Sequence, residues 1–158
     1  MTVFEKKALE IPDRVTMVEI HREDAMRGRA RLVVPGNKEV VIDLPRMEHI
    51  LDGDTFGPSE DGTFYKVWVL PERVMKVSFK SLDKDVIEHA LRLGYHLGNR
   101  HLEAVVEGNA VYVPLLLGRE KIERILKKTM LPLELEVVDK VISPGSSGYF
   151  AGEEEESP

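Results

Sequence analysis

Three of the chain's five histidines lie close together in the sequence and are the side chains best suited to metal chemistry. His89, His96 and His101 fall within and just after a stretch of helical periodicity that runs towards Gly98 and Asn99. Neutral imidazole is a good ligand for nickel, copper and zinc. The sequence contains no cysteine, which excludes disulfides, thiolate metal sites and a cysteine nucleophile. The candidate site of the chain is therefore this stretch.

His101 is favoured as a metal ligand mainly by its position relative to the predicted helix. Glycine readily adopts the left-handed conformation that ends a helix, and asparagine tolerates it better than most residues. Gly98 and Asn99 are therefore predicted to join the helix to a following strand, with His101 on the bend at the start of that strand. From the spacing alone, the favoured interpretation is still a loop histidine that hydrogen-bonds to backbone.

The remaining histidines are weaker candidates. His89 and His96 are seven residues apart, which is two helical turns or ~10.5 Å along the axis, so they cannot bind one metal in the same chain without distortion. We expect His96 to have at most an accessory role. His21 and His49 have no acidic or histidine partner at ligand spacing and are assigned no role.

The first 72 residues are predicted to form a small all-β domain. Pro35, Gly36 and Asn37 separate two β-branched segments and predict a hairpin turn. Short runs of strand character alternate with turn signals, and no convincing helix is seen, so we expect a small barrel or sandwich. The predicted strands cover residues 15–20, 29–34, 39–44 and 63–70.

Residues 73–142 are predicted to form a ferredoxin-like βαββαβ domain, which makes the chain an α+β protein. Gly108 and Asn109 predict a two-residue hairpin. The right-handed crossovers place both helices on one face of the sheet. The predicted strands cover residues 74–79, 102–107, 110–115 and 133–138, with helices near 86–98 and 118–129. The first helix is expected to bury a stripe made of Val86, Ala90, Leu93 and Leu97, widened by Ile87, Leu91 and Gly94.

The last segment, residues 143–158, reads as a disordered acidic tail. It is rich in glycine and serine and ends in Glu153–Glu156, which carry four of the acidic charges behind a net charge of −6. The rest of the chain is nearly neutral and shows no basic stripe, so nucleic acid is not an expected partner. No apolar run approaches ~18 residues and the N-terminus resembles no secretory signal, so we expect no membrane partner and a cytoplasmic location.

The heptapeptide from Tyr95 to His101, Tyr-His-Leu-Gly-Asn-Arg-His, resembles the signature of the urease accessory protein E family of nickel metallochaperones. The order of predicted elements is similar over most of the chain. The resemblance implies that His101 is the metal ligand, that the chain is not an enzyme, and that the N-terminal domain resembles the substrate-binding domain of DnaJ-type cochaperones. It further implies a urease accessory GTPase and the urease assembly complex as partners. Relatives with histidine-rich tails store additional nickel there, but this tail contains no histidine.

We therefore expect a homodimer that carries Ni(II) on His101 at its interface and delivers the metal for assembly of the urease active site. Two imidazoles related by a two-fold axis, completed by water or mobile side chains, would make an exchangeable site. Zn(II) or Cu(II) would also be expected to occupy such a site in vitro.

Two alternatives remain open from the sequence. The first is a protein-binding adaptor, in which the N-terminal domain holds a client peptide and metal binding is incidental. The second is a small metal-dependent hydrolase. A hydrolase needs acidic groups beside His101 to activate water, and Glu103 is the only near neighbour in the sequence.

Overall fold

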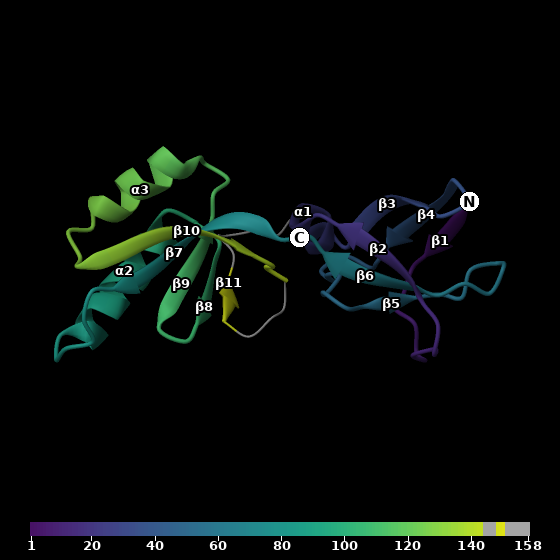
Figure 1. The fold of residues 1–158 in the computed structure, drawn as a ribbon, viewed down its shortest axis with the longest axis horizontal. Coiled ribbons are helices and arrows are strands. Elements are labelled where there is room, and N and C mark those ends of the chain that lie inside the picture. Colours follow the sequence, from purple (N-terminus) through teal and green to yellow (C-terminus); the bar gives the residue numbers. More distant parts are fainter. Residues whose placement is uncertain (144–147, 151–158) are drawn as a thin grey trace. The chain divides into compact units, whose positions relative to one another are not determined.

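The computed structural model describes residues 1–143 and 148–150 (Figure 1). The described chain is an α+β protein with three helices and eleven strands, which confirms the predicted fold class. It divides into two compact units: the first contains residues 1–71 with 141–143, and the second contains residues 72–140 with 148–150. Within these residues, no helix is both long enough and apolar enough to cross a membrane.

The first unit contains two three-stranded sheets. In one sheet, β4 (Lys38–Asp43) pairs in parallel with β1 (Thr2–Phe4) and antiparallel with β3 (Arg29–Val34). In the other, β6 (Tyr65–Val69) pairs in parallel with β2 (Thr16–Ile20) and antiparallel with β5 (Thr55–Phe56). Apolar side chains from both sheets form one buried cluster, as alternating strand patterns require. The hairpin predicted between residues 34 and 38 is confirmed.

The expectation that this region contains no helix was wrong. A short helix, α1 (Arg22–Arg27), lies between β2 and β3. It buries Ala25 and ends at Gly28, whose φ of 68° and whose position against the carbonyl of Glu48 leave no room for a side chain. Six mostly charged residues cannot show helical periodicity, and this is why the pattern missed α1.

The second unit is built on one five-stranded sheet in the order β10-β7-β9-β8-β11, with every pair of neighbours antiparallel. Along the chain, β7 (Glu72–Phe79) leads to α2 (Val86–Asn99), and α2 leads to the hairpin of β8 (Ala104–Glu107) and β9 (Ala110–Pro114). Next come α3 (Arg119–Lys127) and β10 (Leu133–Lys140). The predicted strands, helices and Gly108 turn of this region are confirmed.

Both helices bury their apolar side chains against the same face of this sheet. Leu93 and Leu97 of α2 share one cluster with Ile122 and Leu126 of α3. The strand residues in that cluster alternate along each strand, as residues on one face of a sheet must. They include Met75, Val77, Val111, Val113, Leu133, Leu135 and Val137.

The second apolar stripe on α2 lies outside this core. Ile87 and Leu91 had been expected to widen the buried stripe, yet they are 72% and 71% exposed, and Ala90 is exposed as well. Leu93 and Leu97 are the buried residues of α2. The helix therefore has two apolar faces, and helical spacing by itself does not reveal which of them packs inside the chain.

One segment of the expected tail is ordered against the sheet. β11 (Tyr149–Phe150) pairs with Val105 and Ala104 of β8 and becomes the fifth strand. Residues 144–147 and 151–158 of the predicted tail, which include Glu153–Glu156, lie outside the described residues.

Candidate metal site

His101 lies at the residue where the chain leaves α2, in a left-handed conformation. The helix continues through Asn99, Arg100 follows with a φ of −94°, and His101 has a φ of 54°. The helix therefore ends at Asn99, as predicted, but the left-handed residue is His101 and not Gly98 or Asn99. Both of them remain helical, and the reversal that had been assigned to glycine and asparagine is made by the histidine itself.

Two backbone hydrogen bonds hold this reversal. The amide N–H of His101 donates to the carbonyl oxygen of Gly98 at 3.0 Å, and the amide N–H of Leu102 donates to that of Leu97 at 3.1 Å. This pair of bonds is the Schellman motif, in which the residue at the position of His101 is usually glycine. Leu97 and Leu102 are both buried in the core of the second unit.

The imidazole of His101 is therefore exposed, while the hydrogen bonds of His101 and Leu102 hold the backbone that carries it. The strand that follows begins only at Ala104, so His101 stands on the turn and not in the sheet. A residue with a Cβ pays about 1–2 kcal/mol for the left-handed conformation, and such outliers cluster at functional sites. A histidine in a position that usually holds glycine is therefore a candidate functional residue, although Asn37, Met47 and Met130 also have a positive φ.

His96 and His89 are partly buried on another side of α2, and each contacts an aromatic ring. The ring of His96 lies 6.1 Å from that of Tyr95 in an edge-on arrangement, and the ring of His89 stacks on Phe79 at 6.2 Å. His96 is nine residues after Ile87, which places it about 180° around the helix from that exposed residue. In residues 1–143 and 148–150, no three or more His, Cys, Asp or Glu side chains gather as a metal cluster.

Glu103, the acidic neighbour of His101, is already engaged. Its Oε2 atom lies 3.2 Å from the hydroxyl of Tyr149, which donates to it, and its side chain is partly buried. The carboxylate that a hydrolase would need for activating a metal-bound water is therefore bound to a tyrosine of β11. This contact weakens the hydrolase alternative.

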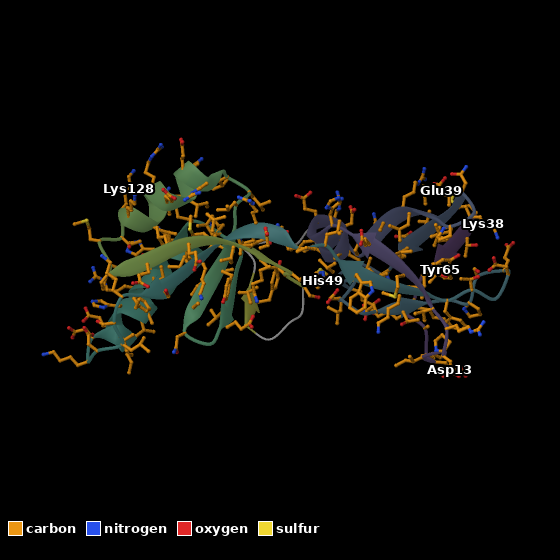
Figure 2. All side chains as sticks on the ribbon, viewed as in Figure 1. Asp13, Lys38, Glu39, His49, Tyr65 and Lys128 are labelled. Atoms are coloured by element: carbon orange, nitrogen blue, oxygen red, sulfur yellow. The ribbon has the colours of Figure 1, made fainter. Side chains whose placement is uncertain are left out.

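The two histidines of the first unit occupy structural positions. The Nδ1 atom of His49, the residue labelled in Figure 2, lies 2.6 Å from the carbonyl oxygen of Met26 and donates to it. This bond ties the loop before β5 to α1. His21 directly precedes α1. Neither position offers a ligand cluster within the described part of the chain.

Comparison with known proteins identifies the family. Residues 72–157, more than half of the chain, match the family described as the UreE urease accessory protein, C-terminal domain. The chain belongs to the UreE family of urease accessory proteins. This membership agrees with the expectation that the chain acts as an accessory protein and not as an enzyme.

Individual UreE proteins match this chain over 85 to 114 residues. The chain is 35% identical over 85 residues to the urease accessory protein UreE of Ralstonia nicotianae, covering 54% of this chain and 37% of the relative. It is 33% identical over 93 residues to UreE of Mesorhizobium japonicum, covering 59% and 44%. With UreE of Acinetobacter baumannii the identity is 29% over 114 residues, covering 71% and 68%. The chain thus spans about two-fifths of the length of the first two relatives.

The left-handed conformation of His101 predicts an unusual order of stabilities. We expect His101→Gly to have a free energy of unfolding about 1 kcal/mol higher than His101→Ala, because only glycine is free of the Cβ clash at this φ. Urea denaturation of the two variants measures the difference. Asn99 provides the matched control: it is helical, so Asn99→Gly should be less stable than Asn99→Ala. The same order at both positions would contradict the assigned conformation.

Proposed function

We propose that the chain is a urease metallochaperone that binds Ni(II) through His101 at a homodimer interface and delivers it during assembly of the urease active site. The observation that carries the proposal is the exposed imidazole of His101 in the left-handed position at the end of α2. Family membership supplies the urease context. The partners are a urease accessory GTPase and the urease assembly complex, and the location is the cytoplasm.

The proposal assigns a role to each predicted domain. Residues 73–142 form a ferredoxin-like metal-binding and dimerisation domain, an assignment supported by the connectivity β7-α2-β8-β9-α3-β10 and the sheet order β10-β7-β9-β8. Residues 1–72 form a β-rich domain that binds a peptide or partner. Residues 143–158 are the acidic tail, most of which lies outside the described residues.

The outer face of α2 supports the dimer. Ile87, Leu91 and Tyr95 recur every four residues and are each 71–72% exposed. A Cβ placed on Gly94 or Gly98 would meet nothing within 4 Å, so another helix can approach this surface closely. Exposed apolar side chains gathered on one face mark an interaction site. A two-fold contact through this face in which the two α2 helices cross near Tyr95 would bring together the helix ends that carry His101.

A metal site shared between two subunits suits a protein that carries metal. Two imidazoles with water or mobile side chains leave coordination positions open, and open positions allow the metal to be passed on. His96 faces away from Ile87, so it is assigned an accessory role at most. Zn(II) and Cu(II) would compete for the same imidazoles in vitro, since nitrogen ligands suit all three metals.

Loss of the His101 imidazole is expected to abolish the tightest nickel site. Calorimetric titration of His101→Ala should show no high-affinity Ni(II) binding, whereas His96→Ala should weaken binding only modestly. His89→Ala is the control for removing a histidine from the same helix and should leave the affinity unchanged. Equal losses in His96→Ala and His101→Ala would show that the ranking of the two residues is wrong.

A charge on the outer face of α2 is expected to separate the dimer. Leu91→Arg places an unpaired cation in an apolar interface and should lower the measured mass in light scattering to that of a monomer. Nickel affinity should fall with it, because each monomer keeps one imidazole. Val33→Arg is the matched control, since Val33 is 73% exposed on β3 of the first unit and should leave mass and affinity unchanged. A dimer that persists in Leu91→Arg would exclude this face.

A specific surface in the first unit supports the adaptor as the second candidate function. A groove of about 760 Å³ lies along the segment after β1, and its lining includes Phe4, Leu9, Pro58 and Phe64. Leu9 and Ile11 are almost fully exposed beside it. Apolar side chains of this kind suit a bound peptide. Under the adaptor reading, peptide binding to this groove would persist in His101→Ala and metal binding would be incidental.

A further inference from the structure

The free edge of β10 is the longest part of the second unit's sheet that is left without a neighbour. β10 pairs with β7 over all eight of its residues, from Leu133 opposite Phe79 to Lys140 opposite Glu72. On its other side, no strand is present among the described residues. An unpaired edge of this length presents backbone donors and acceptors to which another strand can bond.

The register shows which residues of β10 face outwards. Just before β10, the amide N–H of Lys80 donates to the carbonyl oxygen of Pro132 at 2.9 Å, so these opposed residues form a hydrogen-bonded pair. Hydrogen-bonded pairs recur at every second residue of an antiparallel ladder. The even-numbered residues of β10 therefore bond to β7. The odd-numbered residues Leu135, Val137 and Asp139 turn their N–H and C=O groups to the free edge, whereas the N–H of Leu133 already donates to the carbonyl oxygen of Leu131 at 2.9 Å.

A groove lined by four leucines and three charged side chains runs beside this edge. It has a volume of about 440 Å³ and lies between α3 and β10, with Leu126 and Lys127 on one side and Leu131, Leu133 and Leu135 on the other. The three leucines on the β10 side are only partly buried. A strand added to β10 would place every second side chain over these leucines, because directly opposed residues point to the same face of a sheet.

The opposite face of β10 selects the charge of the added strand. Glu134 and Glu136 are exposed there and form no ion pair with the described residues, although Lys76 of β7 lies directly opposite Glu136 in the register. Charges on an edge strand normally discourage pairing, and these two repel an acidic strand while attracting a cationic one. The edge is therefore selective and not simply blocked.

A second copy of β10 is a poor match for the same edge. Lys140 is the only cation of the strand, and its Nζ already lies 2.6 Å from Oε2 of Glu107 and 4.5 Å from the centre of the Tyr112 ring. A second β10 would thus offer the glutamates no free cation. The chain's own Glu153–Glu156 segment carries the same sign of charge as the edge.

We propose that the β10 edge binds an extended segment of a partner protein in which apolar and cationic residues alternate. The apolar residues fill the groove beside α3, the cationic residues face Glu134 and Glu136, and the backbone continues the sheet by β-augmentation. This binding site is separate from His101 and does not depend on the proposed nickel chemistry.

Labelled synthetic peptides of eight residues test the proposal on the full-length protein. Fluorescence anisotropy should show that a peptide alternating valine and lysine binds, and that one alternating valine and glutamate does not. Val137→Pro removes an outward N–H that does not bond to β7, a position where an edge strand tolerates proline. It should weaken binding at least about fivefold, the factor for one net backbone hydrogen bond. Nickel binding should be unchanged.

Charge reversal gives the second measurement and remains decisive if Val137→Pro fails to fold. Glu134→Lys combined with Glu136→Lys should transfer the preference to the glutamate peptide. Glu19→Lys combined with Glu60→Lys changes the net charge equally at exposed positions of the first unit and should keep the preference for lysine. The proposal is overturned if both double variants shift preference alike, if wild type binds both peptides equally, or if folded Val137→Pro binds as tightly as wild type. It also fails if Val137→Pro instead lowers the oligomeric mass, since a second copy would then occupy the edge.

Discussion

The structure around the candidate site depends on the bond between two buried leucines at the end of α2. The amide N–H of Leu102 donates to the carbonyl oxygen of Leu97 at 3.1 Å, and both side chains lie in the core of the second unit. A chain held at both ends of so short a span must reverse direction between them, and one residue has to become left-handed. That residue is His101. Core packing thus determines where the imidazole stands, although the imidazole itself is exposed.

The two apolar faces of α2 have different roles. One face, with Leu93 and Leu97, holds α2 on the sheet, while Ile87 and Leu91 remain exposed on another. In the proposed dimer, the first face orients His101 within its own chain and the second brings two such residues together. Changes to the outer face should therefore alter assembly without disturbing the turn that carries the histidine.

Much of this fold could be predicted from sequence because its signals are local. Turn residues and alternating apolar residues located the main strands and both hairpins, and helical spacing located α2 and α3. The signals failed where tertiary contacts decide. The core, and not the glycine-asparagine pair, determines which residue after α2 is left-handed. The space beside the sheet determines which apolar face of α2 is buried. β11 forms through pairing with β8 in a segment of loop-like composition. His101 was singled out by its residue type together with the resemblance of residues 95–101 to the family signature, whereas its left-handed backbone has no local signature.

The placement of His101 also bears on how a carrier can bind metal firmly with few ligands. Each ligand on a mobile loop would lose conformational freedom on binding, at about 1–2 kcal/mol for the backbone of each residue that becomes ordered. The Schellman turn has already ordered this segment during folding, so metal binding does not incur that cost again. In the proposed carrier, a rigid backbone would offset the small number of ligands, and the coordination shell would stay open for transfer of the metal. The backbone of His101 is strained as a result, because the left-handed conformation of this position suits glycine better than histidine.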